Sequence, residues 1–280
     1  FTDIDPLYDL AFLMMDLDHR GHGGLAVEVF NAWAERMASE PGAEIAIAYG
    51  GLALMPFFKA CRAGIRAKVG ALALRGRDPA TCEAERAEAR AYLALALRYL
   101  TAKPPARLIA AGGLSGSGKS TLAWALAERL GAVVLRSDAI RKGLWGVEHA
   151  EKLPREAYAA EVTARVYRAM LVRARMVLDG GATVILDAAH LKAEERDRAG
   201  ALAAQAGAAF DGFWLDAPVE RLKARVTARG LGREADASDA DARVVEKQTG
   251  YDLGPIRWQR LAAESSPEAV ADMAMAALGG

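Results

Sequence analysis

Nine consecutive residues have the types and spacing of a phosphate-binding loop. They read GLSGSGKST, from Gly113 to Thr121, and fit the P-loop pattern G-x-x-x-x-G-K-[ST] at every fixed position. Glycines there let backbone N–H groups approach an anion without a Cβ in the way. Lys119 is placed to reach the β- and γ-phosphates, and the Ser120 hydroxyl is a hard ligand suited to Mg²⁺. The loop therefore predicts a site for ATP and Mg²⁺. The residues predicted to bind the nucleotide are Gly113, Ser115, Gly116, Ser117, Gly118, Lys119, Ser120 and Thr121.

The flanking sequence supplies the structural context that this loop needs. An apolar run at 108–111 predicts a strand before it, and a helical pattern begins near Lys119. The unsatisfied N–H groups and the dipole of that helix favour a phosphate. The alternative, a glycine-rich turn that only joins a strand to a helix, is disfavoured because the strand, the helix and every fixed residue are present.

A second group of polar residues follows the next predicted strand, at 132–136. Ligands of an open parallel sheet bind beyond the carboxyl ends of its strands, where Ser137, Asp138 and Arg141 lie. We expect Ser137 to cap the next helix and Asp138 to accept the proton of an acceptor hydroxyl. Arg141 would hold the substrate or spread phosphoryl charge. The alternative is an ordinary cap with a surface ion pair.

A third predicted strand, at 183–187, is apolar and ends in Asp187. An Asp at this position commonly orients Mg²⁺ or its bound water in P-loop enzymes, so Asp187 is the second predicted metal ligand after Ser120. Contact with the acceptor and capping of the next helix are the alternatives. His190 is interpreted as a hydrogen-bonded structural residue.

Arginines at four-residue steps follow further along the chain, at Arg225, Arg229 and Arg233, with glycines in the last interval. Such a segment suits a lid that closes over phosphates and excludes water, with Arg229 and Arg233 as catalytic arginines. A solvated helix face followed by a loop is the alternative. Ser238 and Asp241 then have the spacing of a capping box.

The composition restricts the class of protein. The chain has 280 residues, a formal net charge of zero and two cysteines, Cys61 and Cys82, outside any metal or redox motif. A neutral balance gives no support for a nucleic-acid surface, and the cysteine usage fits a reducing, cytoplasmic setting. The apolar stretch at 45–58 is too short to span a bilayer, and no signal peptide is evident.

The elements that must position these residues fall into two blocks. Residues 1–103 are predicted to be helical, with helices at 6–18, 25–37, 51–74 and 81–100, and the prolines at 104–105 mark a boundary. From 107 onward, strands alternate with helices, which predicts an α/β fold with a five-stranded, mostly parallel sheet. The remaining strands are predicted at 209–215 and 257–262. In a long helix at 155–178, the stripe Tyr158, Val162, Val166 and Met170 is expected to be core.

Residues 106–280 resemble the P-loop small-molecule and polynucleotide kinases. This group includes gluconate kinase, chloramphenicol phosphotransferase, polynucleotide 5′-kinase and zeta-toxin-like kinases. The resemblance rests on GLSGSGKST, on RSDAIRK at 136–142, on VILDAAH at 184–190 and on RVTARG…DASDADA at 225–242. It implies that Asp138 activates the acceptor hydroxyl and that Arg229 and Arg233 belong to the lid.

The front of the chain resembles the tail of an aminoglycoside-phosphotransferase-like domain, over residues 4–17 and 51–69. The catalytic H-x-D loop and metal-binding Asp of that fold do not occur before residue 100, so we expect no separate kinase site there. Asp9 and Asp16 are interpreted as helix-surface or capping residues. The expected organisation is a helical domain at 1–103 and a P-loop kinase domain at 104–280, with an upstream phosphotransferase-like domain as a partner.

The leading hypothesis is an ATP- and Mg²⁺-dependent phosphotransferase that acts on a hydroxyl of a small molecule. A polynucleotide 5′-hydroxyl kinase is the second, and the neutral composition argues against it. The third is a nucleotide-dependent switch without a metabolic substrate.

Overall fold

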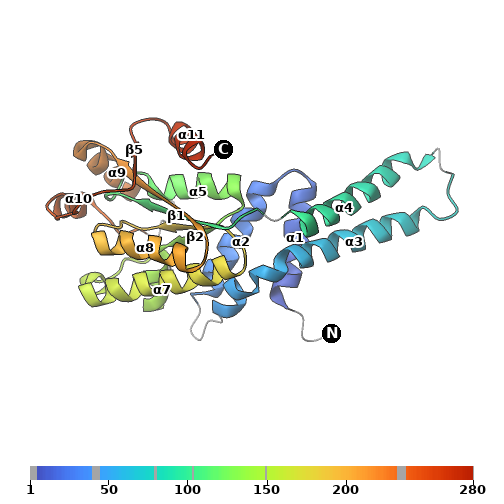
Figure 1. The fold of residues 1–280 in the computed structure, drawn as a ribbon, viewed down its shortest axis with the longest axis horizontal. Coiled ribbons are helices and arrows are strands. Elements are labelled where there is room, and N and C mark those ends of the chain that lie inside the picture. Colours follow the sequence, from blue (N-terminus) through green and yellow to red (C-terminus); the bar gives the residue numbers. More distant parts are fainter. Residues whose placement is uncertain are drawn as a thin grey trace.

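A five-stranded parallel sheet with helices on both faces forms the body of the protein, and a helical hairpin extends from it (Figure 1). The computed structural model describes residues 5–39, 45–78, 81–102, 104–148, 150–231 and 238–279. The described strands are β1 (Arg107–Gly112), β2 (Val133–Arg136), β3 (Val184–Asp187), β4 (Ala209–Asp216) and β5 (Gln259–Ala262). The described α-helices are α1 (Pro6–His19), α2 (Gly23–Met37), α3 (Met55–Ala73), α4 (Glu83–Thr101), α5 (Lys119–Leu130), α6 (Ser137–Trp145), α7 (Ala160–Asp179), α8 (Ala193–Gln205), α9 (Val219–Leu231), α10 (Ala242–Thr249) and α11 (Pro267–Ala277).

The strand order is β2-β3-β1-β4-β5, and every pairing is parallel, which confirms the predicted α/β fold. Strands β2, β3 and β1 end at one level, because Asp187 of β3 pairs with Ala111 of β1 on one side and with Arg136 of β2 on the other. The loop that follows β1 and the helix that follows β2 therefore start beside Asp187. This register brings the predicted site residues to one edge of the sheet.

Alternate residues of the strands pack into two separate cores. Leu108 and Ala110 face a core shared with α7 and α8, whereas Ile109 faces a core shared with α5 and α11. Because both faces are covered, β1 is apolar almost throughout, and residues 108–111 are fully buried. No helix in the described parts of the chain is long and apolar enough to cross a membrane.

The front helices pack against the sheet and share its core, which the sequence patterns did not indicate. Helix α2 lies along β2, where the Asn31 side chain donates to the Ala132 carbonyl oxygen (3.1 Å) and accepts from the Val134 N–H (2.7 Å). Leu7 and Phe30 belong to the same hydrophobic cluster as the strands. The domain boundary at 103/104 remains a prediction.

Helices α3 and α4 form the hairpin that projects from the body in Figure 1. Its base is closed by a small core that includes Met15 of α1, Ala63 of α3 and Leu95 of α4. A polar layer lies beside it, since Tyr99 Oη donates to Asp18 Oδ2 (2.6 Å) and Lys59 Nζ pairs with the same oxygen (2.6 Å).

The predicted helix at 155–178 differs from the observed one at its start. A 3₁₀ turn covers Arg155–Tyr158, and α7 begins at Ala160. Val166 and Met170 are buried as expected. Tyr158 lies outside the helix and is 44% exposed, so its assignment to the core stripe is wrong.

Candidate active site

The phosphate-binding loop connects β1 to α5 and takes a conformation that requires its glycines. Gly113, Gly116 and Gly118 have positive φ angles of 140°, 81° and 95°. A Cβ on Gly116 would lie 2.6 Å from the Leu222 carbonyl oxygen, and one on Gly113 would lie 2.7 Å from that of Leu215. Both neighbours are backbone atoms that cannot rotate away, so only glycine fits at these positions.

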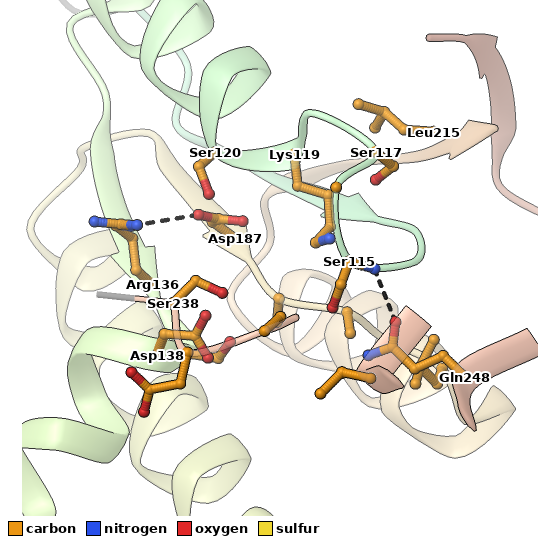
Figure 2. Close-up of a pocket in the computed structure, with 18 of the residues that line it drawn as sticks. Ser115, Ser117, Lys119, Ser120, Arg136, Asp138, Asp187, Leu215, Ser238 and Gln248 are labelled. Atoms are coloured by element: carbon orange, nitrogen blue, oxygen red, sulfur yellow. Dashed lines mark hydrogen bonds and ion pairs between the residues drawn. The ribbon is translucent and has the colours of Figure 1, made fainter. Parts of the chain in front are cut away.

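Polar groups of the loop converge on its concave side. Lys119 Nζ donates to the Leu114 carbonyl oxygen at 2.9 Å. The Ser115 N–H donates to Gln248 Oε1 at 2.8 Å, so α10 lies against the mouth of the loop (Figure 2). The buried Ser117 hydroxyl finds no hydrogen-bond partner among the described residues. The sequence analysis did not identify Gln248 as a site residue, since no local pattern connects it to a loop 133 residues away.

Ser120 and Asp187 form a pair of oxygen donors suited to a hard cation. The Ser120 hydroxyl, in the first turn of α5, points toward the Asp187 carboxylate at the end of β3 (Figure 2). Asp187 is only 5% exposed, and its Oδ2 lies 3.5 Å from Arg136 Nε. No group of three or more His, Cys, Asp or Glu side chains with metal-binding geometry occurs among the described residues. Magnesium accepts such a set, because it usually keeps several water or phosphate ligands.

Asp138 lies in the first turn of α6 and lines a cavity that the phosphate-binding loop also lines. Burial raises the pKa of its carboxyl; a hydrogen bond with Ser238 opposes this, and the negative charge of Asp187 raises the pKa further. The expected Ser137 cap is wrong, since Ser137 is the first residue of α6 and Arg136 is at the N-cap. The helix therefore starts one residue earlier, directly from the strand.

Arg141 is held against the wall of the cavity by α7 and the turn before it. It is 6% exposed, and its Nη1 donates to the Ala157 carbonyl oxygen at 2.6 Å. The guanidinium carbon lies 4.8 Å from the centre of the Tyr158 ring, in cation–π range. Arg141 thus lines the cavity with a guanidinium that these two contacts hold in place.

Asp239 holds the segment before α10 onto the segment before α7. Its carboxylate accepts from the Leu153 N–H (2.9 Å) and from Tyr158 Oη (2.8 Å), and it pairs with Lys142 Nζ (3.1 Å). Burial opposes ionisation, but these three contacts together lower the pKa of Asp239. The sequence patterns did not predict these contacts of Asp239, because the residues that make them are far apart in the chain.

The predicted lid arginines fall mostly outside the described part of the chain. Arg229 lies in α9, but its side chain is not described, and Arg233 lies outside the described residues. Arg225 Nη2 donates to the Ala263 carbonyl oxygen (2.8 Å), and its Nη1 donates to the Gly116 carbonyl oxygen (3.4 Å), so Arg225 contacts the backbone of the loop. The lid remains a prediction.

The capping assignment at the start of α10 needs correction. The N-cap residue is Asp241, whose Oδ1 accepts from the Val244 N–H at 3.0 Å. Ser238 lies three residues earlier and instead hydrogen-bonds to Asp138. Sequence spacing identified a capping pair here but placed the cap at the wrong end of it.

His190 is structural, but not in the way expected. It has a positive φ of 49°, and its side chain is buried between the rings of Tyr167 and Trp258. Its backbone N–H donates to Tyr167 Oη at 2.9 Å, whereas neither ring nitrogen finds a hydrogen-bond partner among the described residues. Burial, with a smaller contribution from the positive charge of Lys119, lowers the pKa of His190 to about 3.

Most of these groups surround one cavity of about 1140 Å³. The loop, Asp187, Asp138 and Arg141 all line it, together with Tyr167 of α7 and Glu195 of α8. Sites for a single small ligand are typically about 300–1000 Å³. The cavity therefore has room for a nucleotide and a second small molecule side by side.

Comparison with known proteins assigns this part of the chain to a family. Residues 108–251, just over half of the chain, match the family described as an AAA domain, and the chain belongs to that family. The uncharacterized proteins Rv2004c of Mycobacterium tuberculosis and Mb2027c of Mycobacterium bovis are each 32% identical to it over 256 residues. These matches cover 90% of this chain and 48% of each relative, so the chain spans about half the length of the curated relatives it matches.

Among solved structures, the APS kinase CysC of Mycobacterium tuberculosis, in complex with AMPPNP and APS, is similar over 63% of this chain and 100% of that one, with 24% identity and a TM-score of 0.48. A gluconokinase from Sinorhizobium meliloti is similar over 62% of this chain and 92% of that one, with 21% identity and a TM-score of 0.42. At TM-scores below 0.5, these similarities carry no weight for function. The P-loop geometry and the family together define a nucleotide-binding P-loop domain.

Proposed function

We propose that this protein is an ATP- and Mg²⁺-dependent phosphotransferase that transfers the γ-phosphoryl group to a hydroxyl of a small molecule. One observation carries the proposal: a P-loop and a half-buried carboxylate, Asp138, line the same cavity. Phosphoryl transfer needs the nucleotide and an acceptor held side by side with a group that positions the attacking hydroxyl.

The nucleotide side of the reaction falls to the loop. Its backbone N–H groups and Lys119 would hold the phosphates, and Ser120 and Asp187 would hold Mg²⁺. When bound, the ion would supply charge neutralisation at the β- and γ-phosphates. Arg136, which pairs with Asp187, would keep that carboxylate oriented toward the loop.

The acceptor side falls to Asp138 and its neighbours. The carboxylate would orient the acceptor hydroxyl and take its proton as the bond to phosphorus forms. Arg141 would contribute positive charge at the wall of the cavity, and Arg229 and Arg233 would steady the transferring group from the lid. Glu195, which lines the same cavity, would supply a carboxylate for further hydroxyls of the acceptor.

Two further proposals concern the context of this domain. The helical front, residues 1–103, is proposed to be the tail of an aminoglycoside-phosphotransferase-like domain, with the remainder of such a domain as its partner. A cytoplasmic location is the second.

The base assignment is tested by Asp138→Asn, with Asp272→Asn as a matched control on the surface, where Asp272 pairs with Arg129. We expect Asp138→Asn to lower kcat by roughly 10²–10⁴ while ATP binding stays within a few-fold of wild type. The control should keep both. If Asp138→Asn kept the wild-type kcat with the true acceptor, the assignment of Asp138 as the base would be wrong.

A further inference from the structure

The candidate base, Asp138, is hydrogen-bonded to a hydroxyl of the chain itself. Ser238 hydrogen-bonds to the Asp138 carboxylate and lines the same cavity as Lys119 and Ser120. In the close-up, Ser238 lies between Asp138 and the pair formed by Ser120 and Asp187 (Figure 2). Its hydroxyl therefore contacts the Asp138 carboxylate in the cavity that the phosphate-binding loop also lines.

The contacts of neighbouring residues hold Ser238 in this place. Asp239, the next residue, is bound by the Leu153 N–H, Tyr158 Oη and Lys142 Nζ, at 2.9, 2.8 and 3.1 Å. Lys142 is almost completely buried, at 1% exposed, so its pairing with Asp239 is shielded from solvent. Two residues further on, Asp241 caps α10. The two residues that anchor this segment, Asp239 and Asp241, thus closely follow Ser238 in the chain.

A serine hydroxyl bonded to a carboxylate at the edge of a nucleotide site is a nucleophile–base pair. We propose that Ser238 is itself a phosphoryl acceptor, and that the protein transfers the γ-phosphoryl group of ATP to Ser238 Oγ when no small-molecule acceptor is bound. This inference rests on the proposed function, because it uses the same nucleotide and the same base.

The step balances without a further reactant. Ser238 Oγ forms a bond to the γ-phosphorus of ATP, and the bond from that phosphorus to the β,γ-bridging oxygen breaks. ADP leaves with the bonding pair, and the hydroxyl proton passes to Asp138. The product is a phosphoserine monoester.

The surroundings of Ser238 can accommodate the product. Arg136 and Arg141 both act on the Asp138 carboxylate through their positive charge, and Lys142 lies beside Asp239. Arg136 and Arg141 thus supply positive charge near the new phosphate, which carries a charge of about −1.5 to −2 at pH 7. The phosphate would also cover Asp138 and keep an acceptor hydroxyl from reaching it, so the modified chain would be inactive toward small molecules.

The test incubates the full chain with ATP and Mg²⁺ and no added acceptor, followed by intact mass measurement and phosphopeptide mapping. We expect a single phosphoryl group per chain, on Ser238. Ser238→Thr keeps a hydroxyl and should still be modified, whereas Ser238→Ala should not be. Lys119→Ala should abolish the modification, and Asp138→Asn should slow it by roughly 100-fold or more.

Ser265 provides the matched control, because it is another serine that lines the cavity. Ser265→Ala should be phosphorylated on Ser238 like wild type. Phosphate on Ser238 supports the inference even if no small-molecule acceptor is ever found. Absence of phosphate on Ser238, in protein that binds ATP, overturns it, and so does equal labelling of Ser238→Ala. An acceptor that raises ADP release while Ser238 stays unmodified would leave the proposed function standing and overturn only this inference.

Discussion

The close packing of the phosphate-binding loop gives a sharp prediction at Gly116. Its φ of 81° and the 2.6 Å that would separate an alanine Cβ from the Leu222 carbonyl oxygen are separate obstacles to a side chain. The left-handed conformation costs an alanine roughly 1–2 kcal/mol. The backbone oxygen cannot turn away, so Gly116→Ala must also displace the loop and with it the N–H groups that would hold the phosphates.

Gly131 separates the two effects. It also has a positive φ, of 66°, but no atom lies within 4 Å of its Cβ position. Gly131→Ala should therefore lose about the same conformational free energy and leave the loop in place. We expect Gly116→Ala to bind ATP at least about tenfold more weakly, a loss of roughly 1.4 kcal/mol, and Gly131→Ala to bind it like wild type. Calorimetric titration with a non-hydrolysable ATP analogue and Mg²⁺ measures this, with thermal melting of both variants in parallel. Equal affinity in the two variants would refute the assignment of this loop as the phosphate site.

Three further outcomes follow from the structure. Only the ionised carboxyl of Asp138 can take a proton, and the pKa of this carboxyl is raised. On acidification, kcat/KM should therefore begin to fall at a pH above the ordinary pKa of an aspartate. A pH–rate profile whose acidic limb lies at or below that pKa contradicts this prediction. His190 has a pKa of about 3 in the folded protein and an ordinary pKa of 6.5, so the unfolded chain binds a proton first and acidification favours unfolding. Between pH 7 and pH 5, the free energy of unfolding should fall by about 2 kcal/mol in wild type and not in His190→Asn. Identical pH dependence of the two proteins in denaturant unfolding would rule this out. Asn31→Ala leaves the buried Ala132 carbonyl and Val134 N–H without their partner, so it should cost about 2–4 kcal/mol in the same assay, whereas a loss well under 1 kcal/mol would show that α2 does not secure β2.

Much of the fold was predictable from the sequence because its signals are local. All the described strands lie within about two residues of their predicted ranges, and short apolar runs mark β1, β2 and β3 directly. The loop at 113–118 was predictable for the same reason, since its pattern is contiguous and lies between a predicted strand and a predicted helix. The carbonyl oxygens of Leu215 and Leu222, which restrict Gly113 and Gly116, come from distant segments.

The rest of the site depends on contacts between distant segments, for which one sequence carries no signal. Gln248 reaches Ser115 across 133 positions, and Asp239 reaches Leu153 across 86. The spacing of Ser238 and Asp241 indicated a helix cap. That pattern does not reveal that the Ser238 hydroxyl instead hydrogen-bonds to Asp138. The packing of α2 on β2 was missed likewise: Asn31 in an amphipathic helix gives no hint that it bonds to a strand edge.

Phosphoryl transfer to a hydroxyl is tested most directly by ADP release from ATP and Mg²⁺ across a panel of acceptors, with Lys119→Ala as the blank. The panel would hold sugars, sugar acids, aminoglycosides, nucleosides and 5′-hydroxyl oligonucleotides. We predict that one small-molecule class raises the rate well above its level without acceptor, and that Lys119→Ala removes the increase. If ATP binds but no acceptor raises the rate, the protein is not a small-molecule kinase, and a nucleotide-dependent switch takes its place.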